Sequence, residues 1–162
     1  MSVSDEFLQA NAQYADSRTK GALPMPPARK VAVVTCMDAR LDPAQFLGLE
    51  EGDAHVIRNA GGRAADAIRS LVISQQLLGT REIVVIHHTD CGMMTFTDAQ
   101  LHQKLHDELH VHAEIPFLPF TDLEQSVRDD VAAIRESPLL LPDVPVRGFI
   151  YDVRDGRLRE VV

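Results

Sequence analysis

The stretch VAVVTCMDAR at residues 31–40 decides the fold, because a fully apolar run leads directly into chemically active side chains. Two further short apolar runs follow it, AHVI at 54–57 and IVVI at 83–86. Strands that are apolar throughout are typical of a parallel sheet that is covered on both faces. We therefore expect the three runs to be strands of one buried sheet.

Helical patterns alternate with these runs. Two helices and a last strand are expected at 64–78, 121–136 and 146–153. Gly79 is expected to cap the first of these helices, and Asp155 with Gly156 to form a hairpin turn after the strand. The alternation predicts an α/β fold, a mainly parallel β-sheet flanked by helices.

The N-terminal segment has a different character. A helix is expected over 5–17, with Ser4 as its N-cap. The prolines of GALPMPPARK at 21–30 predict an extended linker after it. We therefore expect a single α/β domain, 1–162, with an N-terminal helical arm over about 1–29.

Composition and charge restrict the class of protein. The chain of 162 residues is 45% hydrophobic and 25% charged, and its net charge is −8. Nucleic acids and anionic membranes bind clustered Lys and Arg, so neither is expected as a partner. No apolar run approaches the roughly 20 residues that span a bilayer. The start MSVSDEFLQANAQYADS is polar and acidic, unlike a secretory signal, so a cytoplasmic location is expected.

The two cysteines lie at the ends of predicted strands. Cys36 directly follows the run 31–35, and His88 and Cys91 follow the run 83–86. Ligands bind at the carboxyl ends of strands in open α/β sheets, so the three side chains are expected to converge there. Two thiolates and one imidazole are a suitable ligand set for Zn²⁺, and the open fourth position is typical of a catalytic site.

Two charged residues follow the first cysteine, Asp38 and Arg40. Asp38 could accept a hydrogen bond from a water molecule at the metal, while Arg40 holds it ionised in a bidentate pair. Alternatively, Asp38 could bind the metal as a fourth ligand and close the site. The sequence leaves both arrangements open.

These residues resemble the motifs of the β-class carbonic anhydrases. The family has Cys-x-Asp-x-Arg followed some fifty residues later by His-x-x-Cys, present here in CMDAR at 36–40 and HHTDCG at 87–92. IRNAGG at 57–62 is similar to the segment between them. Met37 and Ala39 stand where the family commonly has serines. The resemblance is to the compact bacterial members.

The resemblance implies a zinc lyase that hydrates carbon dioxide reversibly to bicarbonate and a proton by metal-hydroxide attack. It also implies a homodimer or a dimer of dimers, often with exchanged N-terminal helices. The implied zinc ligands are Cys36, His88 and Cys91, and the implied catalytic residues are Asp38 and Arg40.

Three other functions could use some of these residues. A hydrolase of carbonyl sulfide or carbon disulfide would use the same zinc site, because these substrates are isosteres of CO₂. A non-catalytic zinc-binding scaffold would have Asp38 capping the metal permanently. A cysteine phosphatase needs five residues between Cys and Arg, whereas three separate Cys36 from Arg40.

Several nearby residues have two interpretations. Gly61 and Gly62 could offer backbone N–H groups to an anion such as bicarbonate, or could simply allow a tight turn. His87 is expected to point away from His88 and to pack. Asp90 is expected to be a turn residue or a helix cap rather than a ligand, and Gly92 is expected to allow a close backbone approach at the metal loop.

Four histidines lie in the region 94–120, where the pattern is least clear and a helix is possible over 98–109. They could shuttle protons, since an imidazole titrates near neutral pH, or simply form a solvated face. They are His102, His106, His110 and His112.

Overall fold

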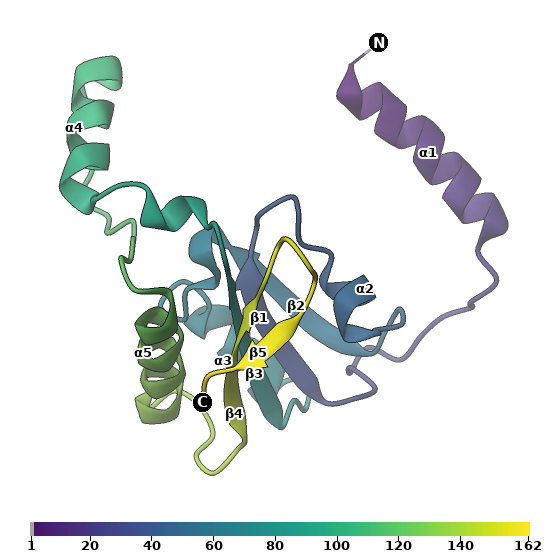
Figure 1. The fold of residues 1–162 in the computed structure, drawn as a ribbon. Coiled ribbons are helices and arrows are strands. Elements are labelled where there is room, and N and C mark those ends of the chain that lie inside the picture. The colour runs from purple at the N-terminus through teal and green to yellow at the C-terminus, as the bar shows by residue number, and fades with distance from the viewer. Residues whose placement is uncertain (1) are drawn as a thin grey trace.

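A computed structural model describes residues 2–162 and contains one five-stranded sheet of order β2-β1-β3-β4-β5 (Figure 1). The strands are β1 Val31–Cys36, β2 Ala54–Asn59, β3 Glu82–His88, β4 Val146–Tyr151 and β5 Leu158–Glu160. The first four run parallel, and β5 pairs antiparallel to β4. The predicted mainly parallel α/β sheet is confirmed.

The register of the two central strands brings their carboxyl ends together. Val31 of β1 pairs with Glu82 of β3, and Thr35 pairs with Ile86. The Thr35 hydroxyl donates to the Ile86 carbonyl at 2.9 Å, so this buried polar group has a partner. The next residue of β1, Cys36, therefore lies at the same sheet edge as the end of β3.

Two helices cover one face of the sheet, α3 Ile68–Gln76 and α5 Leu123–Glu136. Leu71 of α3 and Val131 of α5 belong to one buried apolar cluster with Ala32 and Val85 of the central strands. Alternate strand residues face this cluster, because successive side chains point to opposite faces of a sheet. The main core thus lies between these helices and the sheet.

The boundaries of these helices differ from the prediction. Helix α3 begins at Ile68 because residues 64–67 form turns, with the Ala67 N–H donating to the Ala64 carbonyl. Its C-cap is Leu77, so the expectation of a Gly79 cap was wrong. Helix α5 begins after Asp122, whose carboxylate accepts a hydrogen bond from the Gln125 N–H at 2.9 Å.

The arm consists of helix α1, Val3–Ser17, which stands apart from the sheet in Figure 1. Its N-cap is Ser2, so the expectation of Ser4 was wrong. Ser2 Oγ accepts from the Asp5 N–H, while the Asp5 carboxylate accepts from the Ser2 N–H, and this reciprocal pair fixes the helix start. No residue of α1 is buried against its own chain.

Helix α4, Asp98–Leu109, has the bounds expected from the sequence and also extends away from the sheet (Figure 1). Thr97 and Gln100 cap it reciprocally. Short helical segments that were not predicted are α2 Pro43–Leu47, η1 Ala60–Gly62 and η2 Gly92–Met94. Over residues 2–162, every helix is too short or too polar to cross a bilayer.

The C-terminal hairpin is confirmed. Strand β4 ends at Tyr151, two residues before the expected end, and β5 returns beside it with Tyr151 opposite Leu158. Gly156 lies in the turn with a φ of 74°. This hairpin closes one edge of the sheet next to the end of β3.

Candidate metal centre

Three buried side chains converge at the carboxyl ends of β1 and β3. Cys36 is the last residue of β1, His88 is the last residue of β3, and Cys91 follows three residues later. Their sulfur and ring-nitrogen atoms all lie within 4.8 Å of one another. The side chains predicted to meet at this edge are therefore brought together.

The hydrogen bonding of His88 leaves a lone pair facing the two sulfurs. His88 Nδ1 lies 2.8 Å from the Thr89 carbonyl oxygen, which can only accept, so Nδ1 carries the proton. Nε2 is buried and has no hydrogen-bond partner. A metal cation would satisfy this lone pair, and the Cys₂His donor set is one that Zn²⁺ favours. The residues present fit the ion.

The two free thiols differ electrostatically. The pKa of Cys36 falls to about 4, because the Cys91 thiol donates a hydrogen bond to it and the backbone N–H groups of Asp38 and Gly61 also stabilise the thiolate, against the opposing effect of burial. The pKa of Cys91 is raised, because its proton is shared with Cys36 and because it is buried. Thiolate character at Cys36 is what a metal ligand requires.

Asp38 and Arg40 form a bidentate ion pair beside this cluster. Arg40 donates from Nε to Oδ1 at 3.0 Å and from Nη2 to Oδ2 at 2.7 Å. These bonds from Arg40 hold the pKa of Asp38 far below its usual value. Asp38 Oδ2 lies 3.7 Å from His88 Nε2. The carboxylate is thus ionised, held by Arg40 and close to the unpartnered nitrogen.

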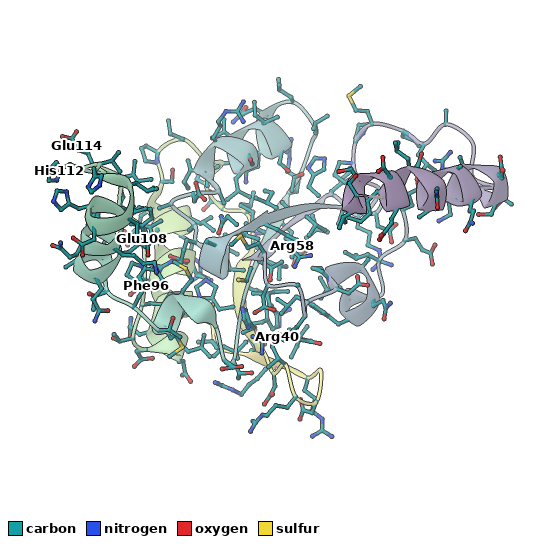
Figure 2. The ribbon with its side chains drawn as sticks, turned by 90° about the horizontal axis from the view of Figure 1, so that it is seen from above. Arg40, Arg58, Phe96, Glu108, His112 and Glu114 are labelled. Atoms are coloured by element: carbon teal, nitrogen blue, oxygen red, sulfur yellow. The ribbon has the colours of Figure 1, made fainter. Side chains whose placement is uncertain are left out.

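Further contacts fix Arg40 and the loop after Cys36. Arg40 also donates to the Asp90 carboxylate and the Asp90 carbonyl, each at 2.8 Å. Arg58 of β2 donates to the carbonyls of Cys36, at 3.0 Å, and Asp38, at 2.7 Å. Figure 2 shows Arg40 and Arg58 in the same part of the molecule. Sequence reasoning missed Arg58, since nothing local marks a residue that binds backbone carbonyls on another strand.

Comparison with known proteins identifies the family. The sequence model of the family described as "Carbonic anhydrase" matches residues 31–116. The chain is 48% identical to Beta-carbonic anhydrase 1 of Mycobacterium tuberculosis over 162 residues, which cover 99% of both chains. The chain belongs to the β-carbonic anhydrase family. Its mainly parallel α/β fold matches that of carbonic anhydrases in this family, and its cluster of Cys36, His88 and Cys91 suits a metalloenzyme.

Other relatives of this β-carbonic anhydrase include a solved structure. A crystal structure of carbonic anhydrase from Streptococcus mutans superposes with a TM-score of 0.95 at 55% identity, covering 100% of this chain and 99% of that one. A carbon disulfide hydrolase from an Acidianus species is 35% identical, over 96% of this chain and 87% of its own length. The carbonic anhydrases named here are thus more similar to this chain than that hydrolase is.

The turn after β2 packs on the end of β1 in this β-carbonic anhydrase. Gly61 and Gly62 have φ values of 82° and 65°, which favour glycine. The Gly61 N–H donates to Cys36 Sγ at 3.3 Å. A Cβ on Gly62 would lie 2.8 Å from the Thr35 carbonyl carbon. A tight turn therefore requires both glycines, and a bicarbonate-binding role for them stays a prediction.

Gly62→Ala is expected to destabilise the protein more than Gly79→Ala. Both glycines have positive φ, which costs a side chain roughly 1–2 kcal/mol. A Cβ at Gly79 meets no atom within 4 Å, whereas one at Gly62 overlaps the β1 backbone and adds about 1–3 kcal/mol. Unfolding by urea measures both free energies, and equal losses would contradict the close packing of the turn.

The predictions for His87 and Asp90 are confirmed, and the prediction for Gly92 is not. His87 points away from the metal ligands, with Nδ1 2.7 Å from Ser126 Oγ, as expected. Asp90 is a turn residue with a φ of 54°, also as expected. The prediction for Gly92 was wrong, because its φ is not positive and a Cβ there would meet no atom within 4 Å. The close backbone approach occurs at Gly62 instead.

The four histidines of the 94–120 region lie on or just after α4. His102 Nε2 lies 3.1 Å from the Ile115 carbonyl oxygen, and the rings of His106 and His112 stack at 4.6 Å. Figure 2 shows His112 at the far side of the molecule from Arg40. A proton-shuttle role for these histidines stays a prediction.

Proposed function

We propose that this protein hydrates carbon dioxide reversibly to bicarbonate and a proton, using one Zn²⁺ held by Cys36, His88 and Cys91. The observation that carries the proposal is the buried, unpartnered His88 Nε2 among two thiols, beside an ion-paired carboxylate. The 48% identity to the mycobacterial Beta-carbonic anhydrase 1 supports the choice of substrate.

A bound zinc ion would supply Lewis acidity, which makes water a nucleophile toward CO₂ near neutral pH. The chain's own residues orient this water. Asp38 would accept a hydrogen bond from it, because its carboxylate lies 3.7 Å from His88 Nε2 and is ionised. A carboxylate with so low a pKa can accept a hydrogen bond from this water and orient it, but it does not take up the water's proton. The released proton would therefore leave to buffer.

Arg40 would keep Asp38 in this orientation. It occupies both carboxylate oxygens of Asp38 and is itself held by Asp90. Rotation of Asp38 onto the metal as a fourth ligand would compete with the two hydrogen bonds from Arg40, which hold both carboxylate oxygens. We therefore favour Asp38 as the residue that orients water over Asp38 as a permanent cap.

Apolar side chains surround the site and suit a small apolar substrate. The buried cluster that contains Cys36 and Cys91 also contains Leu41 and Met93. Partly buried side chains pack against it, namely Phe46, Ala60, Phe96, Phe120, Tyr151 and Val153. A cavity of about 630 Å³, lined in part by Arg40 and Asp90, lies beside the ion pair and would give solvent a route to it.

Hydrolysis of carbonyl sulfide or carbon disulfide is the alternative, favoured by the 35% identity to the Acidianus carbon disulfide hydrolase. The purified zinc protein should be assayed against all three substrates. We expect CO₂ hydration to be the fastest, to disappear on removal of zinc by a chelator, and to return when zinc is restored. Faster turnover of a sulfur substrate would favour the alternative. A zinc-loaded protein with no catalytic activity at any pH would be a non-catalytic scaffold.

We also propose that the protein assembles as a homodimer or a dimer of dimers through α1. Phe7 and Leu8 are 68% and 71% exposed on a helix that contains no buried residue. An isolated helix of 15 residues is marginal in water, so packing against a second copy would stabilise it. Light scattering should give the mass of a dimer or tetramer, and deletion of residues 2–17 should lower it.

A further inference from the structure

A buried carboxylate on α5 accepts an unusual number of hydrogen bonds. Asp130 is 4% exposed and accepts from Arg63 Nε and Nη2, both at 3.0 Å, and from the Ala64 N–H at 3.1 Å. His87 Nε2 lies 3.1 Å from the same carboxylate. Burial would raise the pKa of Asp130, but the hydrogen bonds from His87 and Arg63 lower it instead. The Asp130 carboxylate is therefore ionised and accepts hydrogen bonds both from His87 of β3 and from the turn that contains Arg63 and Ala64.

His87 connects this carboxylate to the glycine turn. Its Nε2 lies between Asp130 Oδ2 and the Gly62 carbonyl oxygen, at 3.1 and 3.2 Å. Both partners can only accept, so Nε2 carries a proton and donates. Nδ1 is held by Ser126 Oγ at 2.7 Å, and the ring is fully buried. His87 thus fixes the position of the Gly62 carbonyl relative to α5.

Asp130 and His87 together hold three consecutive residues of the turn. They bind the Gly62 carbonyl, the Arg63 guanidinium and the Ala64 N–H. The preceding residue, Gly61, donates its N–H to Cys36 Sγ. Two successive residues with positive φ have no side chains to pack, so the turn needs such external support.

We propose that Asp130 is a positioning residue for the metal centre. Through His87 and Arg63 it holds the 61–64 turn so that the Gly61 N–H stays bonded to the Cys36 sulfur. This inference rests on the proposed function, in which Cys36 is a zinc ligand. Groups that orient a metal ligand from outside the coordination sphere contribute about 10–100-fold to metal affinity.

Asp130→Asn tests the proposal because it keeps the side-chain size but turns one acceptor oxygen into a donor. In the place of Oδ1 that donor would face Arg63 Nη2, and in the place of Oδ2 it would face Arg63 Nε, the Ala64 N–H and His87 Nε2. We expect the zinc affinity of the chain, measured by competition with a chelator, to fall about 10–100-fold. The sulfur-to-cobalt charge-transfer absorption of the Co²⁺-substituted protein should shift as well, because the bond to Cys36 Sγ changes.

Two controls separate positioning from stability. Asp129→Asn makes the same change one residue away, at an exposed carboxylate that accepts from Gln125. Val131→Ala removes buried volume at the next position of α5, where the side chain packs against Gly148 of β4. Both should keep wild-type zinc affinity and the wild-type cobalt spectrum. If Asp130→Asn weakens zinc binding no more than Val131→Ala does, the proposal is wrong.

If Asp130→Asn fails to fold, Ser126→Ala tests the proposal instead. It removes the Nδ1 partner of His87 together with the hydrogen bond from the Ser126 hydroxyl to the Leu123 carbonyl, and leaves Asp130 itself in place. We expect a several-fold loss of zinc affinity, and an unchanged affinity would overturn the proposal. Failure of the proposed function gives a different result. In that case the wild-type chain itself would bind no zinc or hydrate no CO₂, whatever the residue at position 130.

Discussion

Cys91→Ser is expected to abolish tight zinc binding and, with it, the hydration of CO₂. A serine hydroxyl stays protonated at neutral pH and is a poor ligand in place of a thiolate. Structural sites with four ligands bind Zn²⁺ with a total free energy of about 10–16 kcal/mol. The loss of one thiolate ligand should therefore weaken binding by on the order of 3 kcal/mol. That corresponds to a loss of affinity of roughly a hundredfold or more.

Metal analysis after dialysis and stopped-flow CO₂ hydration check this expectation. Met37→Ser is the matched control, because Met37 is also a sulfur-containing residue, is adjacent to Cys36 and is 64% exposed. This control should retain both zinc and turnover. Full zinc content together with full turnover in Cys91→Ser would show that the three converging side chains are not the metal site.

Asp38→Asn is expected to keep zinc but to lower the turnover number by about a hundredfold. The three ligand atoms are untouched, so the ion should stay bound. The amide that replaces the carboxylate places a donor group against Arg40 and removes one of the two acceptor oxygens that this pair uses. The orientation of the attacking water would then be lost.

Zinc content and the CO₂ hydration rate should be measured together for this variant. Asp66→Asn, at an exposed carboxylate outside the site, provides the same change of charge and should leave both unchanged. Wild-type turnover in Asp38→Asn would contradict the assigned role. Loss of zinc would point instead to Asp38 as a metal ligand.

The sheet and the convergence of the ligands could be predicted because both depend on local pattern. The runs at 31–35 and 83–86 are apolar throughout and became β1 and β3. Because parallel strands end at one edge, the residues that directly follow the runs had to meet there. A helix over 98–109 was a possibility in the sequence, and α4 has these bounds, with Thr97 and Gln100 capping its start.

Cap positions were predicted less well because several residues compete for each one. Ser2 and Ser4 both precede an acidic, helix-forming stretch, and only the reciprocal bonds between Ser2 and Asp5 decide the start of α1. Gly79 is a suitable cap by type, but α3 ends earlier, at Gln76. Such outcomes depend on backbone geometry at single residues, which residue type alone does not specify.

By itself the sequence singled out the side chains proposed to carry the chemistry, because all five lie at or shortly after the ends of two recognisable strands. They are Cys36, Asp38, Arg40, His88 and Cys91. Only the tertiary structure decided what supports them. Asp130 accepts a hydrogen bond from Arg63, in the turn next to the site, across 67 positions of the chain. Arg58 donates to the Cys36 carbonyl across 22 positions. A buried hydrogen bond between distant residues leaves no local periodicity, so it becomes visible only once the chain has folded.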